Sequence, residues 1–308
     1  MVSCGGEKLE STKHKLSSQN SGVELVVLGI AQDAGYPQIG CTKECCKGLW
    51  NRMDLRKMVS CLGIIDHQSQ KTYLLDATPD IIDQTKILSD FLNPNEFQLP
   101  KGIFLTHGHI GHYTGLMFLG KESSNAKDIP VYAMPRMKSY LERNGPWSQL
   151  VNIENIDIQA MSFDLPIELS SDLTITPIEV PHRGEYSETA GFVVEGPSKK
   201  VLFIPDIDKW KIWERDIKEE ISKVDYAFLD ATFYGNGEVG NRDMSLIPHP
   251  FVEESMRLFQ DLPTSEKSKV HFIHLNHTNP LFNSESEAYQ EVHSAHYNVA
   301  EEGQVFEL

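Results

Sequence analysis

Short apolar runs separated by polar segments dominate the chain between residues 23 and 275. Runs of this kind, closed by glycine, proline or polar residues, are typical of buried β-strands. On this pattern we expect strands at residues 23–30, 61–65, 72–75, 102–105, 130–134, 167–169, 173–180, 190–195, 200–205, 226–229 and 269–275.

Helical segments are expected between several of these strands. Thr78 followed by Pro79 predicts a helix start, because threonine caps helix N-termini and proline suits the first helical position. Strands outnumber helices in both halves of the chain, which predicts two packed sheets with helices outside them, an α/β (α+β) fold. We expect helices at residues 78–92, 114–120, 136–144, 209–222 and 250–260.

Composition narrows the function classes. The chain has 308 residues and 40% hydrophobic content, which is enough for a sizeable core. Its net charge of -16 disfavours non-specific binding to nucleic acid or to an anionic membrane, so we expect no nucleic-acid partner. The sequence has no apolar run of the length that a transmembrane helix needs. An anionic substrate would need positive charge supplied locally at its binding site.

The N-terminal segment differs from the rest. Residues 1–21 are polar and rich in Ser, Lys and Glu, which predicts a flexible tether ahead of a single domain at residues 22–308. The first six residues resemble the end of a bacterial lipoprotein signal, in which Cys4 would carry the lipid anchor. This indicates a periplasmic or membrane-anchored lipoprotein whose signal is removed. A polar cytoplasmic N-terminus with a chance cysteine fits the same residues equally well.

The strongest chemical signal is a cluster of histidines. His107, His109 and His112 fall within six residues, directly after the apolar run at residues 102–105. Neutral imidazole suits zinc, iron and manganese-class ions, and a buried strand fixes where the ring nitrogens point. A loop of unrelated histidines is the alternative, but three so close together make that a poor account. The sequence therefore predicts a metal centre at the end of this strand.

Residues 106–116 resemble the HxHxDH signature of the metallo-β-lactamase superfamily, whose fold is a four-layer αββα sandwich. Further matches follow in the order that this family shows, each after a predicted strand. The resemblance implies one or two catalytic divalent ions (Zn, Mn or Fe). The implied ligands are His107, His109 and His182 for the first ion, Asp206 as a bridge, and His112 and His274 for the second ion.

One position departs from the signature. Gly111 stands where the superfamily has an aspartate that binds the second ion, and glycine has no side chain to bind metal. We therefore expect a firmly bound first ion and a weak or absent second ion. An ion with an open coordination position lowers the pKa of its bound water to about 7, so hydroxide forms at neutral pH.

A second cluster contains sulfur. Cys41, Cys45 and Cys46 lie close together, and the odd total of five cysteines argues against a disulfide framework. Three thiolates need a fourth ligand to complete a structural zinc site. Two subfamilies carry such a loop after the first strand, namely the cyclic phosphodiesterase associated with carbon–phosphorus lyase and the B protein of pyrroloquinoline quinone (PQQ) biosynthesis. Resemblance to the phosphodiesterase implies His277 as the fourth ligand. A reduced triplet without metal is the alternative.

The two subfamilies suggest different chemistry. Residues 29–38, 75–81 and 273–280 look similar to the PQQ B protein, whereas the histidine at position 109 and His182 fit the hydrolase branch. The first hypothesis is hydrolysis of a small anionic ester, most simply a phosphodiester, by metal-bound hydroxide. His249 matches a histidine with which relatives bind or protonate the leaving group, and is a candidate general acid. It fits equally well as a helix-start residue between prolines. Arg183 is a candidate for binding the anion, or an ordinary surface arginine.

Two other functions are consistent with the same residues. The PQQ resemblance implies oxygen-dependent oxidation at a single iron. A metal-binding or sensing module without hydrolase activity is the third hypothesis, because Gly111 removes one acid from the expected set. Specificity in such folds resides in loops, and no loop here identifies the substrate.

Overall fold

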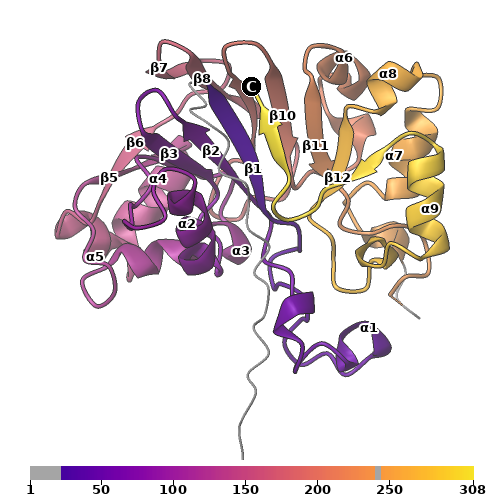
Figure 1. The fold of residues 1–308 in the computed structure, drawn as a ribbon, viewed down its shortest axis with the longest axis horizontal. Helices are drawn as coiled ribbons and strands as arrows, with labels where there is room; N and C mark the ends of the chain where they lie inside the picture. The colour runs from indigo at the N-terminus through magenta and orange to yellow at the C-terminus, as the bar shows by residue number, and fades with distance from the viewer. Residues whose placement is uncertain (1–21, 240–243) are drawn as a thin grey trace, which may run out of the picture.

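The structure of the chain is a computed structural model that describes residues 22–239 and 244–308. Two seven-stranded sheets pack against each other, and helices flank them (Figure 1). The expected αββα sandwich is thereby confirmed. The tether expected at residues 1–21, with the candidate anchor Cys4, lies outside the described residues.

The two sheets have matching architecture. Each has antiparallel strands on one side and parallel strands on the other, with strand orders β14-β1-β2-β3-β4-β5-β6 and β13-β12-β11-β10-β9-β8-β7. The first sheet contains β1 (Val23–Gly29), β2 (Cys61–Asp66), β3 (Lys71–Leu75), β4 (Ile103–Phe104), β5 (Ile129–Ala133), β6 (Ile156–Ala160) and β14 (Val305–Glu307). The second contains β7 (Ile167–Ser170), β8 (Leu173–Glu179), β9 (Ala190–Glu195), β10 (Lys200–Ile204), β11 (Tyr226–Asp230), β12 (Val270–Ile273) and β13 (Asn298–Val299).

The helices are short. The α-helices are α1 (Glu44–Lys47), α2 (Ile81–Asp90), α3 (Ile110–Tyr113), α4 (Pro135–Arg143), α5 (Trp147–Asn152), α6 (Ile217–Ser222), α7 (Val252–Leu258), α8 (Thr264–Lys267) and α9 (Glu287–Ser294). The 3-10 helices are η1 (Met53–Leu55), η2 (Thr114–Leu119), η3 (Trp210–Ile212), η4 (Met244–Leu246) and η5 (Pro280–Phe282). In the described part of the chain, none has the length and apolar character that a membrane span requires.

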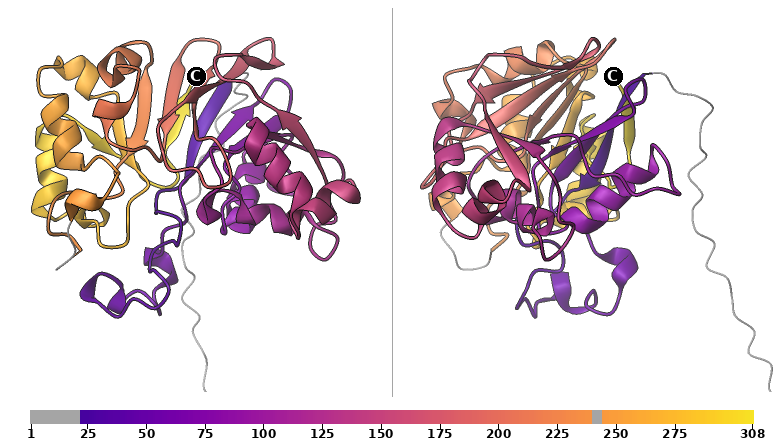
Figure 2. Two further views of the ribbon diagram at one scale, coloured as in Figure 1. Left: turned by 180° about the vertical axis from the view of Figure 1, so that it is seen from behind. Right: turned by 90° about the vertical axis from the view of Figure 1, so that its left-hand side faces the viewer.

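Two apolar layers hold the sheets in place. Phe104 of the first sheet and Phe192 of the second are fully buried, and their rings meet edge to face with centroids 5.9 Å apart. A second cluster packs the outer face of the first sheet against its helices, through buried side chains such as Leu88 and Met137. Burying a side chain of this size contributes about 1.5–3 kcal/mol. Figure 2 shows the resulting layers from two further sides. The strand ends are therefore held in a rigid frame.

Two predicted helices form differently. The helix expected at residues 209–222 is interrupted, because η3 ends before Trp213 and α6 begins only after Asp216. The indole of Trp213 is buried and donates a hydrogen bond to the carbonyl oxygen of Glu179, and the Asp216 carboxylate caps α6 by accepting from the Lys218 amide. The segment expected at residues 114–120 is helical, but it is the 3-10 helix η2.

Candidate metal centre

The predicted ligands follow the carboxyl ends of four strands. His107 comes shortly after β4, His182 after β8, Asp206 after β10 and His274 directly after β12. His109 then precedes α3, which carries His112. Strands pinned by the sandwich core thus deliver these side chains to one place. Two residues at strand ends have left-handed backbones, namely His274 with a φ of 67° and Asp76, directly after β3, with a φ of 73°. This conformation costs about 1 kcal/mol or more and concentrates at functional sites.

We define the first ligand set as His107, His109, His182 and Asp206, whose donor atoms all lie within 4.8 Å of one another. His107 Nε2 is 3.3 Å from Asp206 Oδ2, and His182 Nε2 is 3.4 Å from Asp206 Oδ1. His109 turns its Nδ1 inward, 3.3 Å from His182 Nε2. Three imidazoles and one carboxylate converge here, as the resemblance implies.

We define the second ligand set as Asp33, His112, Asp206 and His274, which meet the same distance limit. His112 Nε2 lies 3.8 Å from Asp206 Oδ2. Asp33 Oδ1 lies 3.0 Å from His112 Nε2 and 3.5 Å from His274 Nε2. Asp33 is absent from the sequence-based candidates. The one signal that could have marked it is its position as an acid shortly after the predicted strand at residues 23–30, since Asp206 also follows a predicted strand.

In four of the five ligand histidines, the second ring nitrogen is held by a hydrogen bond. His112 Nδ1 pairs with Asp76 Oδ2 at 2.7 Å, and His182 Nδ1 pairs with Asp208 Oδ1 at 2.9 Å. Outer partners of this kind fix the ring orientation and tautomer of metal-binding histidines. Threonine hydroxyls hold the remaining two, with Thr106 Oγ1 3.0 Å from His107 Nδ1 and Thr232 Oγ1 3.0 Å from His274 Nδ1.

Several buried nitrogen and oxygen atoms of the ligand side chains lack hydrogen-bond partners. A buried polar atom without a partner costs about 1–3 kcal/mol, so a group of them needs an explanation such as a bound ion. Borderline divalent ions prefer imidazole nitrogen and carboxylate oxygen, and the residues present therefore fit such an ion. The buried, unpartnered atoms include Oδ1 of Asp33 and Asp206 and Nε2 of His107, His109, His112 and His274.

The electrostatics of the two sets differ. Burial lowers the pKa of His107, and the neighbouring His112 lowers it further, so this imidazole is neutral and ready to bind metal. Burial also lowers the pKa of His112, but the carboxylates of Asp76 and Asp33 outweigh that effect and raise it well above its usual value. Burial would raise the pKa of Asp206, but the surrounding histidines, His182 first, hold it well below its usual range. The shared carboxylate is therefore ionised.

His249 joins the centre through Asp206. Its Nδ1 lies 2.9 Å from Asp230 Oδ2 and 3.1 Å from Asp206 Oδ1. Burial lowers the pKa of His249, but the two carboxylates outweigh burial and raise it well above its usual value. Asp230 is itself fixed, because its carboxylate accepts from the Ile207 amide and from Thr232. His249 is thus held as a proton-bearing group beside the shared ligand.

Arg183 lies outside both ligand sets. Its side chain is 66% exposed and forms an ion pair with Glu185, with 3.7 Å between Nη1 and Oε1. Glu185 in turn places Oε2 3.5 Å from His109 Nε2. Among the residues that the structure describes, Glu185 links this arginine to the centre.

The cysteine cluster forms around α1. The thiol sulfurs of Cys41, Cys45 and Cys46 all lie within 4.8 Å of one another, with 3.8 Å between those of Cys41 and Cys45. His277 is not among the donors that meet this limit. It lines a cavity of about 300 Å³ together with Cys41, and its Nδ1 lies 3.0 Å from Asn276 Oδ1. The structure therefore brings the three thiols together, and His277 borders the same cavity as Cys41.

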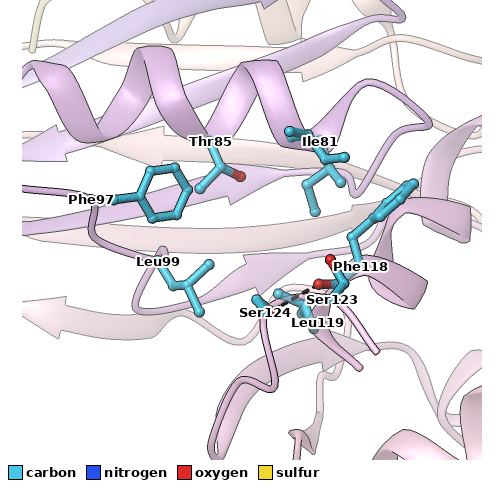
Figure 3. A pocket seen from close by; sticks show the side chains of 9 residues that line it. Ile81, Thr85, Phe97, Leu99, Phe118, Leu119, Ser123 and Ser124 are labelled. Atoms are coloured by element: carbon cyan, nitrogen blue, oxygen red, sulfur yellow. Dashed lines mark hydrogen bonds between the residues drawn. The ribbon is translucent and has the colours of Figure 1, made fainter. Parts of the chain in front are cut away.

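An apolar pocket of about 230 Å³ lies apart from both clusters, between α2, η2 and the segment before β4 (Figure 3). Its walls include Ile81, Phe97 and Phe118, and it shares no residue with either ligand set. We assign it no part in the metal chemistry.

Comparisons with known proteins agree with this geometry. A sequence profile described as "Beta-lactamase superfamily domain" matches residues 71–272. The chain is 22% identical to coenzyme PQQ synthesis protein B of Xanthomonas campestris pv. campestris (strain B100), over 91% of this chain and 98% of that protein. It is 23% identical to the protein of the same name from Gluconobacter oxydans (strain 621H), over 93% of this chain and 99% of that one.

Two solved structures share the fold. The crystal structure of Zn²⁺-bound PqqB from Methylobacterium extorquens superposes with a TM-score of 0.77 at 22% identity, covering 92% of this chain and all of that one. A structure described as a new diphosphatase from the PhnP family superposes with a TM-score of 0.62 at 21% identity, covering 93% and 97%.

Proposed function

The chain belongs to the β-lactamase superfamily, and we propose that it is a metal-dependent hydrolase of small anionic esters, with phosphodiesters as the substrate class. The observation that carries this proposal is the convergence of buried, unpartnered nitrogen and oxygen atoms on Asp206. The similarity to coenzyme PQQ synthesis protein B and to a diphosphatase of the PhnP family supports a small anionic substrate.

Each part of the centre has a role in such a reaction. The first ligand set would hold one divalent ion, and the second set would hold another through the shared Asp206. When bound, such an ion lowers the pKa of a coordinated water and supplies positive charge for an anionic substrate. His249 carries the proton that a leaving alkoxide requires, because two carboxylates keep its pKa high. The surrounding protein orients the histidines and excludes competing ligands.

The test uses protein stripped of metal by a chelator and reloaded with Zn²⁺, Mn²⁺ or Fe²⁺. We expect hydrolysis of bis(p-nitrophenyl) phosphate or of a cyclic nucleotide phosphodiester to return with at least one of these ions. The chelated protein and Asp206→Asn serve as controls. If no reloaded form hydrolyses any phosphodiester or carboxylic ester faster than Asp206→Asn does, the proposal is wrong and a metal-binding module is the better description.

Oxidation at a single iron is the second candidate function. The similarity to coenzyme PQQ synthesis protein B over nearly the whole chain favours it. The geometry favours hydrolysis, because two ligand sets share one carboxylate, whereas oxidation at one iron needs only one set. The two are separated by running the reloaded enzyme without oxygen. Hydrolysis proceeds unchanged under those conditions, and an oxygen-dependent reaction stops.

We also propose that Cys41, Cys45 and Cys46 bind one structural zinc, with His277, which borders the same cavity as Cys41, as fourth ligand. Cys46→Ser is expected to lose one zinc equivalent and to lower the melting temperature. Cys61→Ser is the matched control, because Cys61 is buried in β2 away from this cluster. Equal zinc content in the native protein and Cys46→Ser would contradict the assignment.

A further inference from the structure

The space beside Gly111 is already filled. A Cβ atom added at this position would lie 2.4 Å from the Cα of Asp33 and 2.6 Å from Asp33 Oδ1. No left-handed backbone requires glycine here, since Gly111 is not among the described residues with positive φ. Glycine is therefore required by the close approach of Asp33. The position at which the superfamily signature has an aspartate is occupied by the aspartate of another loop.

That carboxylate points into the second ligand set. Asp33 Oδ1 is buried without a hydrogen-bond partner, although His112 Nε2 and His274 Nε2 approach it to 3.0 and 3.5 Å. Both nitrogens are also buried and unpartnered, so the three atoms form a set of buried donors that a bound ion would satisfy. Carboxylate and imidazole together suit a divalent transition ion.

The backbone fixes Asp33 in this place. The amide of Gln32 donates to the carbonyl oxygen of Leu275 at 2.8 Å, and the amide of Leu275 donates to Ile30 at 2.8 Å. The loop after β1 is thereby hydrogen-bonded to the residue that follows His274. A turn closed by a bond from the Gly35 amide to the Gln32 carbonyl oxygen then presents Asp33. The ligand loop is thus built on the same strand end as its neighbouring ligand.

We infer that Asp33 is a ligand of the second ion and replaces, from the loop after β1, the acid that the superfamily signature carries at position 111. The inference rests on the metal centre of the proposed function and deepens it. A weak or absent second ion was expected because Gly111 stands in place of an acid of the signature. With Asp33 in place, the second set keeps two carboxylates, its own and the shared Asp206. The chain then holds two catalytic ions.

The experiment counts bound metal and does not depend on activity. The full chain is loaded with Mn²⁺, its metal content is measured by mass spectrometry, and its electron paramagnetic resonance spectrum is recorded. We expect the native protein to show the spectrum of a magnetically coupled pair. Asp33→Ala is expected to lose one Mn²⁺ and to show the spectrum of isolated Mn²⁺. His274→Ala should lose the same ion, which identifies the set affected.

Gly111→Ala is the sharper variant, because it removes no donor atom. Its added Cβ displaces Asp33, so we expect the same loss of one Mn²⁺ and of the coupled spectrum. Gly22→Ala is the matched control, since an added Cβ meets nothing within 4 Å there. Circular dichroism and thermal unfolding show whether each variant is folded. If Gly111→Ala does not fold, Asp33→Ala decides the question.

The outcomes separate the two proposals. A coupled Mn²⁺ pair that persists in Asp33→Ala overturns the inference and leaves the hydrolase proposal intact. A native protein that binds a single ion with unchanged affinity in Asp33→Ala also overturns it. A native protein that binds no ion at His107 or His112 contradicts the metal centre itself, and the proposed function fails with it.

Discussion

The two ligand sets of this protein have the same chemistry but different origins. The first takes its ligands from positions that the superfamily signature and the following strand ends supply in order. The second combines a motif histidine, His112, with Asp33 from near the start of the chain and His274 from near its end. A ligand that the sequence motif lacks can thus be supplied by another loop, provided that its carboxylate reaches the same point in space. Motif completeness alone therefore understates the metal-binding capacity of a fold.

The sets are joined in two places. Asp206 is a member of both sets, and the buried carboxylate of Asp76 helps to orient one histidine of each set. Asp76 pairs with His112 directly and accepts hydrogen bonds from the amide and hydroxyl of Thr106, whose hydroxyl in turn contacts His107. The comparison therefore predicts that some substitutions affect both ions and others only one.

The largest effect is expected at the shared ligand. Asp206→Asn keeps the size of the side chain but removes the charge that both sets need, so we expect loss of both catalytic ions. We expect hydrolysis to fall by about 10³-fold or more, a loss in line with removing a bound metal's stabilisation of several kcal/mol. Asp208→Asn is the matched control, because the Asp208 carboxylate pairs with a single ligand histidine, His182 of the first set, and losing an outer partner costs about 10–100-fold. Similar losses in the two variants would contradict a bridging role.

The next effect concerns His249. If it protonates the leaving group, His249→Gln slows hydrolysis of an alkyl phosphodiester by about 10²-fold, the lower end of general acid catalysis. A p-nitrophenyl ester should be much less affected, because p-nitrophenolate leaves without a proton. The measurement is kcat for both esters in both proteins. Equal losses for the two leaving groups would assign His249 to positioning Asp206 instead.

A smaller effect is expected from the outer partners, and it separates the two sets. Asp76→Asn should weaken binding of both ions by about 10–100-fold, because Asp76 orients histidines of both sets. Thr232→Val should weaken only the second ion, since Thr232 contacts His274 and no histidine of the first set. Metal titration of each variant against a chelating dye measures the change. An equal effect of Thr232→Val on both ions would show that the sets are not independent.

The smallest expected effect is on the free energy of unfolding at acidic pH, and it comes from a core histidine outside both ligand sets. His271 in β12 is buried against Phe228 and Phe306, outside both sets, and burial lowers its pKa to about 4. Its folded pKa lies below the ordinary value of about 6.5, so the unfolded state binds more protons as pH falls. Stability is therefore lost below about pH 6.5, by about 1.4 kcal/mol at pH 5.5.

His271→Phe should remove that part of the acid sensitivity in urea unfolding at pH 7.5 and 5.5. His293→Gln is the control, because His293 is exposed at the end of α9. An unchanged pH dependence in His271→Phe would show that this ring is not the group responsible.

The sequence predicted the fold and most of the candidate centre because both depend on local patterns. Short apolar runs marked the strands, and the family resemblance, whose matches fall after predicted strands, marked His107, His182, Asp206 and His274. Asp33 was missed because nothing local indicates that its loop crosses the space beside Gly111. That proximity depends on hydrogen bonds between the loop and Leu275, which are properties of the assembled sheets.

The interrupted helix has a similar cause. The helix expected at residues 209–222 has a helical pattern, but burial of Trp210 and Trp213 draws the chain into a bend between η3 and α6. Tertiary packing, which the local pattern does not encode, decided this case. His277 stays a predicted zinc ligand, because it borders the same cavity as Cys41 but lies outside the group of three thiols.

The most direct test of the two-set centre is anomalous X-ray diffraction at the zinc edge, on crystals of the full chain grown with Zn²⁺. The account predicts two strong peaks beside Asp206, one among the donors of each ligand set, with His107 facing the first and Asp33 facing the second. A peak at the first set alone would contradict the role of Asp33. The absence of any peak among these histidines, in crystals that bind zinc elsewhere, would contradict the metal centre as a whole.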